Sequence, residues 1–309
     1  MQTTIPSDRQ HRIDALGYDY TGQPRELVMT CNLCGANVLV TITHRDRYGF
    51  PAQASACARC GLTFLNPRMT AAAYGRFYDG VYRPLVSAFH GRLIDARTIQ
   101  AEQREYAADR VEFARPFIGG SGLTTMLDIG GSTGVVANHF ARAFALTGTL
   151  IDPAPLEVQE ARAFGLETIT GLVEEYDFGG RRFDVVLICQ TVDHLLDVAG
   201  TLKRVRELLT PNGYVFIDIV DFRAAYLRNW SVEDATKIDH PYYLTQDTMI
   251  AYLRRAGFEG MRVAYAADHL HVSYLCRPTQ PAPQALPDPA SVADLFREIR
   301  YVQNASGSR

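Results

Sequence analysis

Apolar and polar positions alternate regularly through the middle of the chain. Between residues 124 and 256, short apolar runs are each followed by a stretch whose apolar residues recur at helical spacing. Strand followed by helix, repeated, is typical of a parallel sheet covered by helices. The predicted strands are Thr124–Ile129, Thr147–Ile151, Glu167–Thr170, Asp184–Cys189 and Tyr214–Ile219. The predicted helices are Thr133–Ala145, Leu156–Phe164, Val198–Leu209 and Thr245–Ala256.

Two later apolar runs, Gly260–Ala266 and Leu270–Cys276, are joined by a three-residue connection. Such spacing is typical of a β-hairpin, so the parallel sheet is expected to end in an antiparallel pair. Together these elements predict an α/β fold with a mostly parallel seven-stranded sheet. Beyond Pro278, a Pro- and Ala-rich linker precedes one more helical pattern, Val292–Val302.

The N-terminal part has a different pattern. Short β-branched runs surround two cysteine pairs, and a helical stretch with Tyr74, Phe77 and Tyr78 at helical spacing follows. The chain is therefore expected to divide into a flexible N-terminus (1–26), a cysteine ribbon (27–67), a helical connecting or cap segment (68–120), the α/β domain (121–278) and a Pro-rich linker with a terminal helix (279–309).

Composition narrows the class of protein without identifying it. Hydrophobic residues make up 47% of the chain, charged residues 21%, and the formal net charge is -3. A slightly acidic chain has no overall field that attracts nucleic acid. No apolar run reaches the roughly 18 residues of a membrane span, and the N-terminus lacks the apolar region of a signal peptide. A cytoplasmic protein is expected, and the oligomeric state is left open.

Four of the six cysteines form two CxxC pairs, each followed by glycine. The pairs are Cys31 with Cys34 and Cys57 with Cys60. Four thiolates suit a tetrahedral zinc ion, and a site closed by four ligands is structural because no position is left for a reacting group. An iron–sulfur cluster is the alternative. Ribbon-like pairs with intervening strands favour zinc.

A glycine-rich turn joins the first predicted strand to the first helix, in the sequence Leu127-Asp-Ile-Gly-Gly-Ser-Thr-Gly134. Glycines let the backbone approach a ligand, and the helix N-terminus offers unpaired N–H groups. The spacing matches neither the dinucleotide fingerprint nor the P-loop. Asp128 before the glycines favours a ligand with positive charge. Asp152, at the end of the second strand, is expected to bind a ribose diol.

These residues resemble motif I of class I S-adenosylmethionine (SAM)-dependent methyltransferases, LDxGxGxG followed by an acid ending the second strand. The resemblance continues in family order through Arg182–Ile188, Val192–Leu196, Leu208–Gly213 and Ala256–Phe258. It implies a Rossmann-like fold and SAM as cofactor. The implied cofactor-binding residues are Asp128, Gly130, Gly131, Ser132, Gly134, Asp152, Pro153 and Gln190. Ser132 departs from the family, which has glycine there.

A cysteine ribbon before this core is similar to bacterial sugar- and glycan-modifying methyltransferases. The resemblance implies a small-molecule acceptor such as a sugar nucleotide, a glycan or a natural-product intermediate. Sugar C-methyltransferases of this kind carry a further C-terminal domain, which the Pro-rich linker and single helix do not match. O-, N- and C-methylation therefore stay open.

Methyl transfer requires alignment, and a base where the acceptor must lose a proton. His194, at the end of the fourth strand, is the candidate base, with Asp193 beside it and His240 as a second candidate. A structural role for His194 is the alternative. Two other functions also stay open: an RNA methyltransferase whose ribbon grips nucleic acid, and a non-catalytic SAM-binding scaffold, which Ser132 favours.

Overall fold

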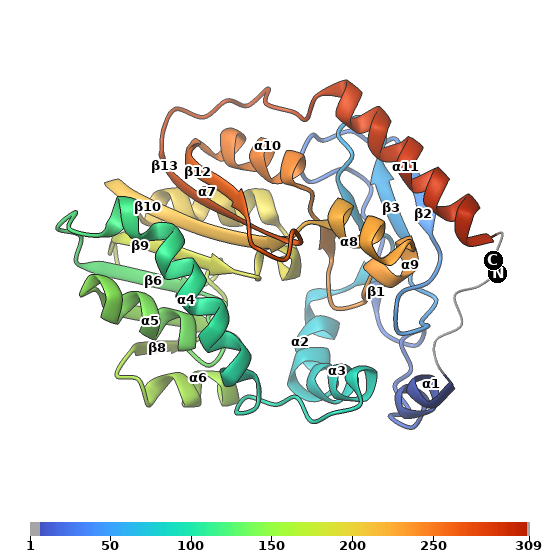
Figure 1. Ribbon diagram of the computed structural model, residues 1–309, viewed down its shortest axis with the longest axis horizontal. Helices are drawn as coiled ribbons and strands as arrows, with labels where there is room; N and C mark the ends of the chain where they lie inside the picture. Colours follow the sequence, from blue (N-terminus) through green and yellow to red (C-terminus); the bar gives the residue numbers. More distant parts are fainter. Residues whose placement is uncertain (1–6, 308–309) are drawn as a thin grey trace.

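The computed structural model describes residues 7–307 and contains a seven-stranded sheet, which lies in the left half of Figure 1. Its strand order is β12-β13-β10-β9-β6-β7-β8, and only the pairs of β13 with β10 and β12 are antiparallel. The predicted α/β fold with a terminal antiparallel hairpin is confirmed. The strands are β6 (Thr125–Ile129), β7 (Thr147–Asp152), β8 (Glu167–Thr170), β9 (Phe183–Cys189), β10 (Leu209–Val220), β12 (Phe258–Tyr265) and β13 (His271–Pro278).

Helices cover both faces of this sheet because its strands are apolar on both sides. In β9, Val185 and Leu187 belong to the core under α4 (Ile99–Ile118) and α5 (Val135–Phe144), together with α6 (Pro155–Arg162). Val186 and Ile188 point the other way and pack with α7 (Val198–Leu208) and α10 (Gln246–Ala256). Successive residues of a strand face opposite sides, so an unbroken apolar run fills two cores.

The strand order reverses at β6, the first strand of the sheet. From β6 the chain builds outward through β7 and β8, and then crosses to β9 and β10 on the other side. At such a switch point the connections leave a crevice at the carboxyl ends of the strands. The loops after β6, β7 and β9 all lie at this end, and they carry most of the predicted site residues.

The two cysteine pairs flank a second, four-stranded sheet of order β11-β4-β3-β2: Cys57 ends β3, and the other three cysteines lie in turns. Three strands come from the cysteine region: β2 (Leu39–Thr43), β3 (Ala54–Cys57) and β4 (Thr63–Leu65). The fourth, β11 (Tyr242–Tyr243), comes from the α/β part of the chain and pairs antiparallel with β4. A small pair of β1 (Arg25–Glu26) and β5 (Arg68–Met69) lies beside it.

The segment expected to be a flexible N-terminus contains a helix, α1 (Ser7–Asp14), within the described residues; residues 1–6 lie outside them. Ile13 and Tyr20 are each only 2% exposed. Both belong to an apolar cluster that also contains residues of α2 (Ala71–Gly80) and α3 (Tyr82–His90). The order of this segment thus comes from distant contacts rather than from its own composition.

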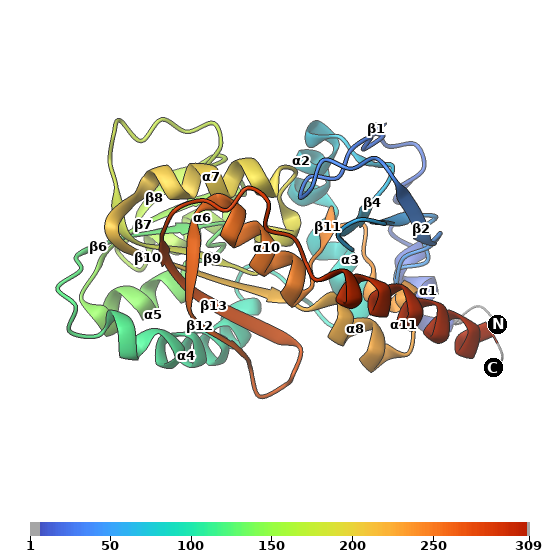
Figure 2. The same cartoon turned by 90° about the horizontal axis from the view of Figure 1, so that it is seen from above.

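Several further elements have no counterpart in the sequence prediction, among them α8 (Phe222–Asn229), α9 (Val232–Ala235) and the short 3-10 helix η1 (Val192–His194). The terminal helix α11 (Pro289–Gly307) is longer than expected. It lies alongside α8 and the cysteine-region sheet (Figure 2), and Leu295, Ile299 and Val302 are buried there. Among residues 7–307, no helix has both the length and the apolar character that crossing a membrane requires.

Candidate active site

The turn between β6 and α5 is crowded at its glycines. A Cβ added at Gly130, whose φ is 66°, would lie 2.3 Å from the Cγ2 of Thr191. One added at Gly131 would lie 2.5 Å from the Oδ2 of Asp128. Both positions therefore require glycine. The backbone turns sharply at the carboxyl end of β6, which leaves main-chain N–H groups near the N-terminus of α5.

Asp128 lies directly beneath this turn and is fully buried. Neither of its carboxylate oxygens has a hydrogen-bond partner among the described residues. Burial, followed by the nearby charges of Asp152 and Asp218, raises the pKa of Asp128 well above its ordinary value. A buried carboxyl group without a partner is costly unless a ligand supplies one. A cationic ligand group would relieve this cost.

Asp152, at the end of β7, is held by backbone N–H groups. Its Oδ2 accepts a hydrogen bond from the N–H of Ser132 at 2.9 Å, and its Oδ1 accepts one from Ala154 at 2.8 Å. Burial raises its pKa to about 6 despite these bonds. Each carboxylate oxygen keeps a further acceptor position, which a ribose diol requires. Pro153 follows on the exposed side of the same turn.

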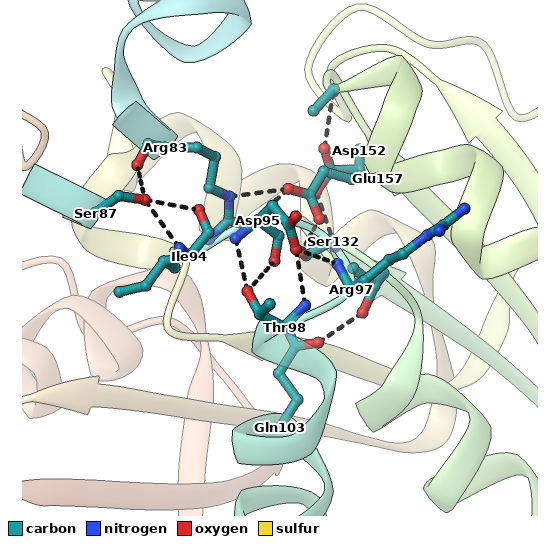
Figure 3. Close-up of polar contacts among 12 residues, drawn as sticks. Arg83, Ser87, Ile94, Asp95, Arg97, Thr98, Gln103, Ser132, Asp152 and Glu157 are labelled. Atoms are coloured by element: carbon teal, nitrogen blue, oxygen red, sulfur yellow. Dashed lines mark hydrogen bonds and ion pairs between the residues drawn. The ribbon is translucent and has the colours of Figure 1, made fainter. Parts of the chain in front are cut away.

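Ser132 points its hydroxyl away from Asp152, toward α6. The Oγ donates a hydrogen bond of 2.7 Å to the Oε2 of Glu157, and its φ of 49° is the left-handed conformation in which glycine is common. The Oε1 of Glu157 also accepts a hydrogen bond of 2.7 Å from the guanidinium of Arg83. One buried carboxylate therefore connects α3 with the glycine turn (Figure 3). Serine thus replaces the family's glycine with a specific partner.

Helix α4 contacts the same region. The hydroxyl of Thr133 donates a hydrogen bond of 2.6 Å to the Oε1 of Gln103, which lies on this helix. Arg110 forms a buried ion pair of 2.9 Å with Asp218 of β10. The Oδ1 of Asp218 accepts a hydrogen bond of 3.0 Å from the N–H of Gln190. The predicted cofactor residues after β6, β7 and β9 are therefore bordered by α3 and α4.

The three predicted catalytic residues come together although His240 lies far along the chain from Asp193 and His194. Asp193 and His194 belong to η1, and the rings of His194 and His240 have centroids 4.4 Å apart. The Oδ2 of Asp193 is 2.8 Å from the Nδ1 of His240. The Nζ of Lys237 is 2.9 Å from the Nε2 of His240. The Nδ1 of His194 is 2.6 Å from the hydroxyl oxygen of Tyr78.

Electrostatics keeps this cluster in a defined charge state. Burial lowers the pKa of His194 to about 4, and the neighbouring His240 acts in the same direction. Burial alone would raise the pKa of Asp193, but the charges of His240 and His194 hold it below its ordinary value. Burial also lowers the pKa of Lys237 to about 8. Near neutral pH, His194 is therefore uncharged and Asp193 is ionised.

Asp193, His194 and His240 also place ligand atoms within 4.8 Å of one another, a spacing that suits a metal ion. Lys237 argues against a cation here because its ammonium group occupies the Nε2 of His240. We therefore interpret these residues as a hydrogen-bonded network rather than a metal centre.

The four paired cysteines form a compact cluster. Their sulfur atoms all lie within 4.8 Å of one another, with 3.5 Å between Cys31 and Cys60 and between Cys34 and Cys57. Tetrahedral zinc with Zn–S bonds of about 2.3 Å separates its sulfurs by roughly 3.8 Å, so the cluster fits that ion. Each pair closes a tight turn: the N–H of Gly35 bonds the carbonyl of Cys31, and the N–H of Gly61 bonds that of Cys57.

The cysteine region also supports the segment that carries Lys237 and His240. Asp46 accepts a hydrogen bond of 2.9 Å from the N–H of Ile238. Arg68 donates to the carbonyl of Leu196 at 2.9 Å and to the hydroxyl of Tyr242 at 3.1 Å. The position of the histidine cluster therefore depends on contacts with the cysteine region as well as on the large sheet.

Comparison with known sequences identifies the family of the chain. Residues 99–263, more than half of the chain, match the family described as a methyltransferase domain. The chain belongs to this methyltransferase family. Membership confirms the predicted enzyme class and implies SAM as cofactor, in agreement with the glycine turn, the unpartnered Asp128 and the acid at the end of β7.

Characterised relatives of this methyltransferase include O-methyltransferases. The ubiquinone biosynthesis O-methyltransferase of Azorhizobium caulinodans is 30% identical over 156 residues, which cover 45% of this chain and 60% of the relative. The protein of the same name from Cereibacter sphaeroides is 26% identical over 193 residues, covering 55% of this chain and 76% of the relative. This methyltransferase thus spans less than two thirds of the length of the first of these relatives.

Solved structures share the fold of this methyltransferase. Mitomycin 7-O-methyltransferase is 20% identical and superposes with a TM-score of 0.50, covering 67% of this chain and 60% of that protein.

Three residues beside the predicted site carried no signal in the sequence: Arg83, Glu157 and Lys237. Arg83 and Glu157 meet although they are distant along the chain, whereas Lys237 contacts His240 within the same loop. A fourth, Tyr78, had a partial signal, because it shares a helical face with Tyr74 and Phe77. That spacing predicted a packed helix, not a hydroxyl group beside His194.

Proposed function

We propose that this methyltransferase transfers a methyl group from SAM to a hydroxyl oxygen of a small-molecule acceptor, with His194 as the general base. The single observation that carries the proposal is the free Nε2 of His194 within the cluster around Asp193 and His240. The curated relatives are ubiquinone biosynthesis O-methyltransferases, which favours oxygen over nitrogen or carbon as the acceptor atom.

The predicted cofactor residues suit SAM. Asp152 would hold the ribose diol, and the turn from Gly130 to Gly134 would pass close to the cofactor. Asp128 would balance the cofactor's positive charge from beneath the turn, and Gln190 would lie toward its methionine end, after β9. When bound, SAM supplies an electrophilic methyl group. The protein must then align an acceptor and accept a proton.

Of the two histidines, His194 is the better base because both nitrogens of His240 are engaged. Asp193 is a carboxylate and can only accept, so the Nδ1 of His240 carries the proton of their 2.8 Å contact. The Nε2 of His240 then accepts from Lys237. Among residues 7–307, the Nδ1 of His194 has a hydrogen-bond partner and its Nε2 has none, since the Oδ1 of Asp193 lies 4.0 Å from Nε2.

Within this reaction, Asp193 and His240 would act by position. The Asp193–His240 contact fixes the carboxylate, and Asp193 in turn favours any positive charge that develops on His194 as it takes the acceptor's proton. The low pKa of His194 keeps the ring neutral and ready to accept that proton at neutral pH. Sugar nucleotides, glycans and natural-product intermediates with a free hydroxyl are the acceptors to examine first.

We further propose that Cys31, Cys34, Cys57 and Cys60 bind one structural zinc ion. The close approach of four sulfurs supports this proposal, since unligated thiolates so near one another would repel. Elemental analysis of the purified protein should find one zinc per chain. Iron in its place would favour the iron–sulfur alternative.

The decisive experiment follows transfer of a labelled methyl group from SAM to a panel of hydroxyl-bearing small molecules, with an RNA sample as a separate arm. His194→Asn should reduce kcat by roughly 100- to 10,000-fold, the usual contribution of a positioned base, with SAM affinity unchanged. His269→Asn is the matched control: His269 is exposed, and its φ of 54° suits asparagine. Full activity in His194→Asn, or transfer to RNA alone, would overturn the proposal.

A further inference from the structure

The hydroxyl group of Tyr78 connects three separate parts of the chain. It lies on α2, 2.6 Å from the Nδ1 of His194 on η1 and 2.6 Å from the main-chain carbonyl oxygen of Asp239. Tyr78 is half-buried, and its ring packs against the His194 ring at 5.8 Å. One phenol oxygen therefore has two close polar partners and only one proton to give.

The chemistry of the two partners decides where that proton lies. A carbonyl oxygen only accepts, so the 2.6 Å contact with Asp239 requires the O–H of Tyr78 to point at the carbonyl. The proton of the contact with His194 must then come from the imidazole. This places a hydrogen on the Nδ1 of His194 and leaves its Nε2 with a lone pair.

Without Tyr78, the surroundings of His194 would favour the opposite tautomer. The Oδ1 of Asp193 lies 4.0 Å from the Nε2 of His194 and has no hydrogen-bond partner among the described residues. An ionised carboxylate at this place attracts a proton to Nε2, where the proton would block the base. Four other polar residues face His194: Lys237, Asp239 and His240 from the adjoining loop, and Tyr82 from α3. None of these four forms a hydrogen bond with the Nδ1 of His194.

We propose that Tyr78 is a positioning residue for methyl transfer, which keeps His194 in the tautomer with a free Nε2. This inference rests on the proposed function, because it assumes that His194 is the base. Tyr78 itself does not lose its proton in the reaction. Its role resembles that of any group beyond the reacting atoms that selects which ring nitrogen of a histidine is available.

The tautomer can be measured directly in the full-length, zinc-loaded protein with ¹⁵N-labelled histidine. Two-bond ¹H–¹⁵N correlations distinguish the Nδ1–H from the Nε2–H form, and the signals of His194 are those that vanish in His194→Asn. The chain has eight histidines, so assignment by subtraction is practical. We expect the Nδ1–H form in the wild type. An Nε2–H form there would overturn the inference without any activity measurement.

Tyr78→Phe should shift His194 toward the Nε2–H form and lower kcat roughly 10- to 100-fold, with acceptor KM and SAM affinity within about twofold of wild type. Tyr74→Phe is the matched control: it lies one turn earlier on α2, and its hydroxyl also donates to a main-chain carbonyl, that of Ile238, at 3.1 Å. The control should keep the wild-type tautomer and rate. A Tyr78→Phe protein with an unchanged tautomer or an unchanged kcat would refute the positioning role.

The same set of variants separates this inference from the proposed function. If His194→Asn loses activity while Tyr78→Phe keeps it, His194 remains the base and only the role of Tyr78 fails. If His194→Asn keeps full activity, the proposed base fails, whichever tautomer the wild type shows.

Discussion

Tyr242 and Phe64 are partners on antiparallel strands, although one follows the histidine cluster and the other belongs to the cysteine region. Their rings also pack at 6.1 Å. The segment that carries Lys237 and His240 thus leads directly into β11, an edge strand of the cysteine-region sheet. The four cysteines proposed to bind zinc and the residues proposed to work on the acceptor are therefore linked through one small sheet.

Removal of the metal should therefore affect turnover more than cofactor binding. A strong chelator, or Cys57→Ser, should loosen the sheet of β2, β3, β4 and β11 and displace His240, because a small ribbon has little core of its own. The glycine turn and Asp152 lie on the large sheet and should keep their shape. We expect methyl transfer to be lost while SAM affinity, measured by calorimetry, stays within a few-fold of the untreated wild type. Adding zinc to the chelated wild-type protein should restore methyl transfer. Equal losses of both would contradict this separation.

Asp152 should control cofactor affinity. Asp152→Ala removes the carboxylate that would accept the ribose hydroxyls and is expected to weaken SAM binding by about 1.5–3 kcal/mol, the scale of hydrogen bonds to a charged group. Asp177→Ala, at an exposed carboxylate in a loop, is the control. Calorimetry with SAM and with its demethylated product reports the change. Unaltered affinity in Asp152→Ala would place the ribose elsewhere.

Two different groups should govern the pH dependence of the reaction: the imidazole of His194 for kcat, and the carboxyl group of Asp152 for cofactor capture. The unprotonated form of His194 is the active one, and its pKa is lowered to about 4, so kcat should be flat near neutrality and fall only as the pH drops toward that value. A histidine with its ordinary pKa of about 6.5 would instead lose half its activity at that pH. The pH profile of kcat at saturating substrates distinguishes the two.

Asp152 predicts a different profile for cofactor capture. Its pKa in the free protein is raised to about 6, and only the ionised form accepts two hydroxyl hydrogens. The kcat/KM for SAM should therefore decline below about pH 6, where kcat is still constant. If kcat and kcat/KM fall together, one group governs both steps and this assignment is wrong.

The contact between Arg83 and Glu157 should hold the cap segment on the glycine turn. Arg83→Ala removes an ion pair whose side chains are only 23% and 11% exposed and leaves the Glu157 carboxylate with Ser132 alone. We expect faster amide hydrogen exchange in α3 and weaker SAM binding. Arg92→Ala breaks an exposed pair with Glu102 and should change neither. Equal exchange rates in the two variants would contradict the role of Arg83.

The large sheet could be predicted from the sequence because its signal is local. The strands β6, β7, β9 and β10 contain apolar runs, and the helices between them have their own periodicity, so order and approximate bounds follow without knowledge of contacts. The strand β3 was missed because Ala54–Cys57 consists of small residues with little β propensity. The strand β11 was missed because two tyrosines after a proline form a strand only through pairing with β4.

The same distinction applies to the candidate site. The glycine turn and its two acids are fixed by spacing along the chain, so they could be listed in advance as cofactor residues, and their role stays a prediction. Tyr78 gains its significance from a distant atom, the Nδ1 of His194, and Arg83 gains its significance from the distant carboxylate of Glu157. A single sequence holds no trace of such pairs.

The position of α11 has a consequence for how the polypeptide matures. The cysteines are synthesised early, but Ala54 and Leu65 of their sheet share a core with Leu295 and Ile299, and Tyr243 completes it. During synthesis this surface stays uncovered until α11 has left the ribosome. We therefore expect stable metal loading to follow the synthesis of α11, and nascent chains halted before residue 292 to bind zinc weakly and to depend on chaperones.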